Sequence, residues 1–309
     1  MNTTRIAYEH EPLKKVLMHR PTREIASVTR DKLSYFNFAD VPDPAVFLAE
    51  FDALKAAFED MGTEVILVGD VLKDDADALE YISHRANMTY TRDMSVVTPA
   101  GAVLCGMAID GRKGDPSIIG KVFARLGVPV VAQLEPDGVL EGGGITFFRG
   151  DTAVVGQCWR SNAAGFAKFE AAIKLGGIRR LISVPVPPDQ FHIDGQLVFV
   201  DSDLAIIDAP VLDFAPATIK DLRTGQTRQQ YMTDFLAQEN VEVIGVEPGD
   251  GWAAVNFVMT KPRQIVGYNW ATRVMSEVEK RGGKAIGVSG VELRKGNGGP
   301  HCMTCPLER

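Results

Sequence analysis

The chain has 309 residues and a formal net charge of −7, from 33 basic and 40 acidic residues. With 45% hydrophobic and 24% charged residues, its composition is that of a globular protein that can bury a substantial core. The acidic balance argues against a nucleic-acid or anionic-membrane partner, because either would need a basic face. A small cationic substrate fits this charge better.

The sequence predicts one domain over residues 1–309. No Ser/Gly run, Pro run, charge block or low-complexity tract interrupts it as a linker would. The N-terminus has no apolar signal region, and no apolar run approaches the roughly 20 residues that span a bilayer. The four cysteines are scattered, unlike those of a secreted disulfide protein. We therefore expect a cytoplasmic protein with reduced thiols.

Helical periodicity recurs five times along the chain, and each helical stretch ends near a Gly or Asn. A short apolar strand follows each one directly, as at 62–68 after the first. Paired strand-like runs bent by turn residues lie between these junctions, for example at 95–104 and 197–207. The predicted helices cover 43–61, 117–126, 162–175, 229–239 and 271–281.

The predicted fold is therefore α/β, built from a strand–strand–helix–strand (ββαβ) unit. The five copies are spaced about 42 to 65 residues apart, which is typical of a repeated supersecondary unit. Five copies can cover each other's apolar faces by closing into a ring around a pseudo-five-fold axis. An open doubly wound sheet is the alternative.

A ring also predicts where polar residues meet. The segments that follow the core strand of each unit should converge on the axis, and they carry acids, a histidine and a cysteine. We expect one central site there. Its candidate residues are Asp70, Glu141, His192, Asp194, Asp250 and Cys302.

Cys302 is the leading candidate for a nucleophile. It follows a glycine-rich turn seven residues from the C-terminus, so little chain is left for it to pack against. Cys302 and Cys305 also have the spacing of a redox dithiol or of half a zinc site. Pro306 stands where a redox motif would start a helix, and no second Cys or His pair completes a zinc site, so both alternatives are weaker.

His192 and Asp194 lie two residues apart in an extended segment, so their side chains share one face. Such a histidine is either a satisfied core residue or a catalytic one, and the neighbouring carboxylate favours catalysis. Glu141 precedes three glycines between apolar residues, where a buried acid needs an internal cation or a ligand. The run lacks the spacing of a phosphate-binding loop, and a purely conformational role for its glycines stays open.

Four motifs stand out in chain order: NMTYTRD at 87–93, EGG at 141–143, HID at 192–194 and GGPHCMTCPL at 298–307. Together they resemble the guanidine-modifying (pentein) superfamily, and arginine deiminase most closely within it. The resemblance implies a five-bladed α/β-propeller, in agreement with the ββαβ repeat, and a reaction that needs no metal and no organic cofactor. It also gives meaning to Asp93, which beside Arg92 would otherwise be half of an ordinary solvated pair.

The resemblance implies a role for each residue of the central site. Cys302 would be the nucleophile and His192 the general acid and base. Glu141 would orient the histidine or bind guanidinium. Asp93 and Asp194 would hold the planar guanidinium in paired, charge-assisted hydrogen bonds.

The resemblance also implies a clamp for the substrate's α-carboxylate, because Asn87, Arg112 and Arg160 have spacings similar to the arginine deiminase positions that form one. Without the family, both arginines would count as ordinary surface residues. Three features depart from the family pattern: Gly144 replaces the usual Asp, His301 replaces another residue, and the helical insertion upstream of 91–93 is missing. These departures resemble smaller members, including dimethylarginine hydrolases, whereas the CMTCPL ending looks like deiminase.

We expect a cysteine hydrolase of a small cationic guanidino compound. The leading reaction converts arginine to citrulline and ammonia through a covalent S-alkylthiouronium. Enzymatic alternatives are dimethylarginine hydrolysis, an arginine dihydrolase that continues to ornithine, and amidino transfer to an amine. A catalytically silent pentein binding protein is the alternative outside enzymes. The superfamily often forms dimers, but no heptad or apolar stripe marks an interface here, so homodimer and monomer both stay open.

Overall fold

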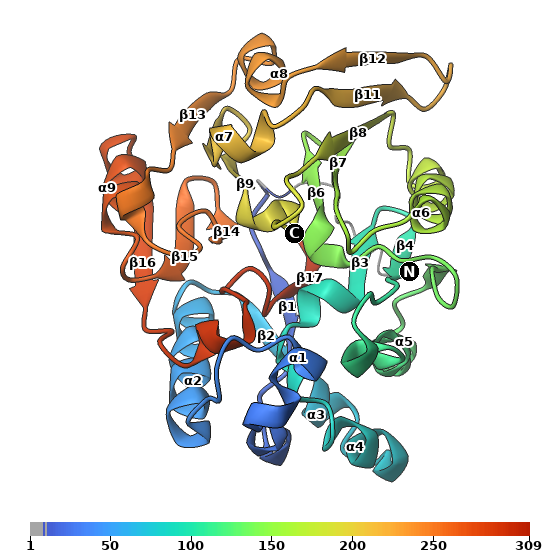
Figure 1. The fold of residues 1–309 in the computed structure, drawn as a ribbon, viewed down its shortest axis with the longest axis vertical. Helices are drawn as coiled ribbons and strands as arrows, with labels where there is room; N and C mark the ends of the chain where they lie inside the picture. The colour runs from blue at the N-terminus through green and yellow to red at the C-terminus, as the bar shows by residue number, and fades with distance from the viewer. Residues whose placement is uncertain (1–8, 10) are drawn as a thin grey trace.

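The computed structural model describes residue 9 and residues 11–309. In this part of the chain the strands form five separate mixed sheets, which Figure 1 shows around the centre of the molecule with helices on the outside. The strands are β1 (Lys15–Met18), β2 (Glu64–Leu67), β3 (Ser95–Thr98), β4 (Gly101–Leu104), β5 (Val130–Gln133), β6 (Ile145–Phe148), β7 (Thr152–Gln157), β8 (Arg180–Pro185), β9 (Leu197–Asp201), β10 (Leu204–Ile207), β11 (Ala217–Asp221), β12 (Thr227–Gln230), β13 (Glu242–Gly245), β14 (Val258–Lys261), β15 (Gln264–Tyr268), β16 (Lys284–Val288) and β17 (Cys305–Glu308).

Every sheet contains the same three-stranded arrangement. Its first two strands pair antiparallel, and the second then pairs with a parallel strand that returns after a helix. This pattern confirms the predicted mixed α/β class, and it differs from the single continuous sheet of a doubly wound fold. The five triplets are β17–β1–β2, β3–β4–β5, β6–β7–β8, β9–β10–β13 and β14–β15–β16.

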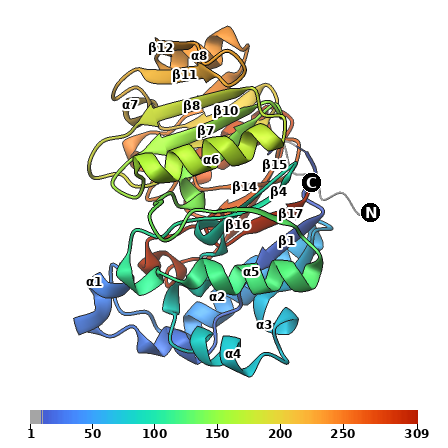
Figure 2. The same ribbon diagram turned by 90° about the vertical axis from the view of Figure 1, so that its right-hand side faces the viewer.

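The helices lie mainly on the outside of the sheets, and Figure 2 shows two of them, α5 and α6, in front of the strands. Within the described residues, every helix falls short of the length and hydropathy that a transmembrane span requires. The α-helices are α1 (Leu33–Phe36), α2 (Pro44–Asp60), α3 (Val68–Val71), α4 (Ala76–Ile82), α5 (Asp115–Leu126), α6 (Ala163–Leu175), α7 (Ala209–Leu212), α8 (Met232–Gln238) and α9 (Thr272–Lys280), and the 3-10 helices are η1 (Arg23–Ser27), η2 (Arg30–Lys32), η3 (Ala86–Thr89), η4 (Thr91–Met94), η5 (Asp110–Arg112), η6 (Gly142–Gly144), η7 (Ile193–Gly195), η8 (Pro248–Asp250) and η9 (Leu293–Gly296).

All five predicted helices are present, as α2, α5, α6, α8 and α9. The largest boundary error is at α8, which begins at Met232 rather than at 229. Gln229 and Gln230 instead pair with β11 as part of β12. The β11–β12 hairpin was not predicted: it lies between α7 and α8 and extends the β6–β7–β8 sheet by pairing β11 with β8.

Helix α2 shows how local sequence produces a covering helix. The Asp43 side chain accepts hydrogen bonds from the backbone N–H groups of Ala45 and Val46, and Pro44 occupies the first turn, where its missing N–H costs nothing. The buried face repeats at helical spacing and packs into the core around β1 and β2. Its largest apolar members are Phe47, Phe51, Leu54 and Phe58.

The buried carboxylate of Glu50 on α2 connects this helix to the segment that enters η9. Its Oε1 accepts hydrogen bonds from Ser289 Oγ at 2.6 Å and Val291 N at 2.9 Å. Its Oε2 accepts from Glu292 N at 2.8 Å and Leu293 N at 3.1 Å. One side chain therefore satisfies the backbone N–H groups at the start of η9, just upstream of the glycine-rich turn before Cys302.

We predict that Glu50→Ala destabilises the protein strongly. Leaving buried N–H groups without a partner costs about 1–3 kcal/mol each, so the free energy of unfolding in urea should fall by about 3–5 kcal/mol. Glu59→Ala, on the same helix, removes an exposed pair with Lys55 and should cost less than about 0.5 kcal/mol. Equal losses in the two variants would contradict the role assigned to Glu50.

Candidate active site

Five of the predicted site residues lie in short turns that come directly before the first strand of a triplet. Asp93 lies in η4 before β3, and Glu141 precedes η6 and β6. His192 and Asp194 lie at η7 before β9, and Cys302 lies in the turn before β17. All five side chains are buried. Because the first strands lie toward the middle of the molecule in Figure 1, these turns meet there.

The Cys302 thiol lies against a carboxylate and an amide. Its Sγ donates to Asp194 Oδ2 at 3.3 Å and receives a hydrogen bond from Asn256 Nδ2 at 3.4 Å. Burial raises the pKa of this thiol well above its ordinary value, and the Asp194 and Asp93 carboxylates raise it further. The thiol is therefore protonated in the free protein, and it needs a cation beside it to ionise.

Asp194 stays ionised because His301 supports it. Its Oδ2 lies 2.8 Å from His301 Nδ1. Burial works against the charge, but the hydrogen bond and the charge of His301 outweigh it and lower the Asp194 pKa. His301, one of the two residues that depart from the family pattern, therefore contacts the same Asp194 carboxylate that the Cys302 thiol contacts.

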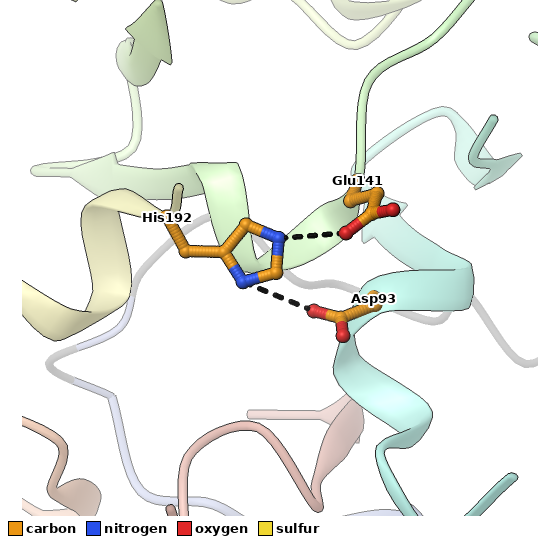
Figure 3. A group of neighbouring side chains, drawn as sticks. All are labelled: Asp93, Glu141 and His192. Carbon is orange, nitrogen blue, oxygen red and sulfur yellow. Dashed lines mark hydrogen bonds and ion pairs between the residues drawn. The ribbon is translucent and has the colours of Figure 1, made fainter. Parts of the chain in front are cut away.

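His192 lies between two carboxylates, as Figure 3 shows. Its Nε2 is 2.9 Å from Glu141 Oε2, and its Nδ1 is 3.6 Å from Asp93 Oδ1. Burial favours the neutral imidazole, but Asp93 and Glu141 outweigh that effect and raise the His192 pKa. The histidine therefore keeps a proton to a higher pH than usual, which suits a group that must donate one.

Glu141 has a full set of partners. Its Oε1 accepts from Ala108 N at 3.0 Å, and its Oε2 accepts from Arg160 Nη1 at 2.8 Å as well as contacting His192. Burial opposes its charge, but Arg160 and His192 hold its pKa well below the usual range. Between the two predicted roles, this geometry favours orienting the histidine over binding guanidinium.

The two arginines predicted to clamp a carboxylate are buried, not on the surface as the sequence alone suggested. Arg160 contacts Glu141. Arg112, in η5, donates from Nη1 to Asp93 Oδ2 and from Nη2 to the backbone oxygen of Tyr90 at 3.1 Å. Asn87, the third predicted member of the clamp, donates from Nδ2 to the backbone oxygen of Phe36 at 2.9 Å.

A small hollow has about 290 Å³ of empty space, counting the part open to solvent, and is lined by Asn87, Asp93, Arg112, Arg160, His192 and Cys302 among others. Several buried atoms around it have no hydrogen-bond partner among the described residues, although buried polar groups are nearly always paired. Asp93 Oδ1 is an unpartnered acceptor. Arg160 Nε and Nη2 are unpartnered donors, and Asn87 Oδ1 is a further acceptor. Arg112 Nε also lacks a hydrogen bond, but it lies 4.0 Å from Oδ2 of the buried Asp115 carboxylate. The hollow is thus complementary to a ligand that carries both a cation and an anion.

Asp93, Glu141 and His192 also form a group whose nitrogen and oxygen atoms lie within 4.8 Å of one another, close enough to share a metal ion. Arg112 and Arg160 already neutralise these two carboxylates. A divalent ion would have to enter beside two guanidinium groups, which is electrostatically costly. The charge distribution therefore fits a protonated histidine better than a metal.

Two predicted members of the site lie elsewhere. Asp70, in α3, is exposed. Asp250 accepts a hydrogen bond from Nε of Arg273 at 2.8 Å and so forms an ion pair with a residue of α9. Both predictions are wrong because the converging turns come before the first strand of each triplet, and Asp70 and Asp250 follow the last.

Asn256 is the site residue that the sequence analysis missed. It lies two residues before β14, as Asp93 lies two residues before β3. Besides donating to the Cys302 sulfur, it accepts a hydrogen bond from His301 N through Oδ1 at 3.0 Å. The fifth triplet therefore also contributes to the centre, and the position before its first strand is the signal that identifies the residue.

Cys305 has surroundings different from those of Cys302. It lies in β17, where it pairs with Leu17 of β1, and its Sγ is 3.3 Å from Ser95 Oγ. The four cysteines are free thiols. The structure thus gives the two cysteines separate neighbours, which does not favour a dithiol or zinc site.

The arginine deiminase family model matches residues 69–309. The chain is 23% identical to the arginine deiminase of Mycoplasma capricolum over 388 aligned positions, covering 96% of this chain and 95% of that protein. It is equally identical to an arginine deiminase of Streptococcus agalactiae, with 96% of each chain covered.

Solved structures share the fold at lower identity. The DDAH of Pseudomonas aeruginosa, complexed with citrulline, superposes with a TM-score of 0.71 at 18% identity, over 95% of this chain and 99% of that one. The N-terminal domain of ArgZ, a cyanobacterial arginine dihydrolase, gives 0.72 at 15% identity, over 96% and 98%. The family match covers far more than half of the sequence and includes every residue of the site. The chain therefore belongs to the arginine deiminase family, within the guanidine-modifying (pentein) superfamily of hydrolases that act on guanidino C–N bonds.

Proposed function

We propose that the protein is a cysteine hydrolase of a guanidino compound that also carries a carboxylate, with arginine to citrulline and ammonia as the leading reaction. The observation that carries this proposal is the set of unpartnered atoms around the small hollow. A guanidinium N–H suits Asp93 Oδ1, next to His192. A carboxylate suits the free Nε and Nη2 donors of Arg160, because the Arg112 guanidinium lines the same hollow and adds its positive charge.

The first chemical step begins with ionisation of the thiol. A bound guanidinium brings a positive charge to Cys302, which offsets the effect of Asp194 and Asp93 on its pKa, and the thiol releases its proton to solvent. The Cys302 sulfur then attacks the guanidinium carbon and forms a C–S bond. As the C–N bond breaks, His192 gives its proton to the departing nitrogen, which leaves as the amine.

The second step releases the product. Water attacks the carbon of the S-alkylthiouronium, and the now neutral His192 takes its proton. The C–S bond breaks, the thiol is restored and a ureido compound leaves. Glu141 keeps His192 oriented through both transfers, because its contact with Nε2 leaves Nδ1 to face Asp93 and the hollow.

We also propose that the five triplets are the blades of one α/β-propeller and that residues 1–309 act as a single catalytic domain. The identical pairing order of the triplets and the meeting of their first-strand turns at one centre support this. Dimethylarginine hydrolysis, dihydrolysis and amidino transfer proceed through the same covalent intermediate. They differ in the amine that leaves and in what attacks next.

We predict that 2-chloroacetamidine, a guanidinium-like alkylating agent, adds once to the native protein and that the adduct maps to Cys302 by peptide mass spectrometry. Cys305→Ser should still be labelled, and Cys302→Ser should not. Cys302→Ser should also lose at least about 10³-fold in turnover while keeping its circular dichroism spectrum. An adduct on Cys158 or Cys105 alone would show that Cys302 is not the nucleophile.

The two arginines predict discrimination between arginine and agmatine, which lacks the carboxylate. Hydrogen bonds to a charged group contribute about 1.5–3 kcal/mol, so kcat/KM should be about 10- to 100-fold higher for arginine. Arg160→Lys should reduce this ratio toward one, because lysine loses the bidentate geometry. Arg223→Lys, in the exposed β11–β12 turn, should leave the ratio unchanged. Equal turnover of arginine and agmatine by the native protein would contradict the assignment of Arg112 and Arg160 as carboxylate-binding residues.

The turn after Glu141 gives a matched pair of variants. A Cβ added at Gly143 would lie 2.6 Å from His192 Nδ1 and 2.7 Å from Asp93 Oδ1, whereas one at Gly144 would meet only Leu140, at 3.7 Å. Gly143→Ala should therefore displace the histidine and lower kcat by about 100-fold or more. Gly144→Ala should stay within about threefold of the native enzyme. Similar kcat values for both variants would mean that the close approach at Gly143 does not matter.

A further inference from the structure

A second and larger hollow meets the first one at the reacting groups. It is a cleft with about 1340 Å³ of empty space, counting the part open to solvent. Cys302 and His192 line both the cleft and the small hollow, together with Phe191 and Asn297. The reaction described above uses the small hollow only, so the cleft has no role in it.

The walls of the cleft are acidic and apolar. Asp194 lies beside the thiol and is paired with His301, and Glu247 lies 3.6 Å from Arg273 Nη1. Asp208 is the acid of the lining for which the described residues show no ion pair. The apolar lining includes Val211 and the ring of Trp252, which is 40% exposed. Among the described residues that line the cleft there is no lysine and no arginine. Such walls suit an alkyl chain that carries a positive charge.

The cleft also lies where a leaving group must go. If the carboxylate end of the substrate is held by Arg112 and Arg160 in the small hollow, the guanidinium carbon reaches Cys302 at the boundary between the two hollows. A nitrogen on the far side of that carbon then faces the cleft and Asp194. Ammonia needs no more room than a water molecule, about 30 Å³, so the cleft is far larger than an ammonia exit requires.

We propose that this cleft is a subsite for a leaving amine larger than ammonia. The inference rests on the proposed function and specifies its substrate class: arginine-like guanidines in which a terminal nitrogen carries an aminoalkyl group. Cys302 forms the C–S bond, the C–N bond to the substituted nitrogen breaks, and His192 supplies the proton. The alkylamine leaves as a cation, and water then attacks the carbon while His192 takes its proton. The C–S bond breaks, which restores the thiol and releases one ureido acid, so one water is consumed per turnover.

The test compares three substrates with the full-length enzyme: L-arginine, Nω-propyl-L-arginine and Nω-(3-aminopropyl)-L-arginine. Ureido product and released amine are measured by mass spectrometry. We expect kcat/KM for the aminopropyl compound to exceed that for arginine at least tenfold and that for the propyl compound at least threefold. The ratio of the aminopropyl compound to arginine tests whether a substituent occupies the cleft. The ratio of the aminopropyl to the propyl compound tests whether the cleft favours a positive charge.

Variants assign the effect to the cleft. Asp208→Asn, which keeps a side-chain acceptor for the N–H of Val211 at the start of α7, should reduce the preference for the aminopropyl over the propyl compound at least threefold. Asp234→Asn, an exposed acid on α8 outside the cleft, should not change it. If arginine is turned over as well as or better than both substituted compounds, the proposed subsite is wrong. The proposed function is unaffected by that result. If no guanidine yields ureido product and Cys302 resists 2-chloroacetamidine, the proposed function itself fails.

Discussion

Glu141 is an ionised carboxylate held out of water, and the rest of the site depends on the two groups that share its Oε2. Removing a carboxylate from water costs several kcal/mol, which only close cationic partners can offset. Arg160 and His192 provide that compensation, and in doing so each becomes fixed in direction. Glu141 Oε2 thus orients His192 and also positions Arg160, which still has free donors for a ligand. Arg112 and Asp93 repeat this arrangement on the other side of the imidazole.

The repeated unit was predictable because apolar periodicity and turn residues mark it along most of the chain. The five covering helices and the strands that follow them were expected within a few residues. The β11–β12 hairpin was not, because β12 consists of polar, mostly exposed residues with no alternating apolar face. The position of the hairpin depends on the pairing of β11 with β8, a strand of the β6–β7–β8 triplet. The local sequence of the hairpin does not predict that pairing.

The site was predicted in part, for similar reasons. Motif residues could be recognised, but Arg112 looks like a surface side chain until Asp93, 19 residues away, is placed against it. Asp70 and Asp250 were assigned to the centre from their place after a strand, whereas the centre is built before the first strand of each triplet. Asn256 satisfies that rule without any motif, so only the assembled fold reveals it.

The position of Cys302, the proposed nucleophile, also depends on contacts between distant parts of the sequence. The segment that carries Cys302 enters β17, which pairs with β1, and Thr91 Oγ1 donates to the backbone oxygen of Met303 across 212 residues. Arg309 donates to the backbone oxygens of Glu9, Glu11 and Met259. Many contacts of such high sequence separation slow the folding of a domain. The surroundings that raise the pKa of the Cys302 thiol therefore exist only once the N-terminal and C-terminal strands have packed together.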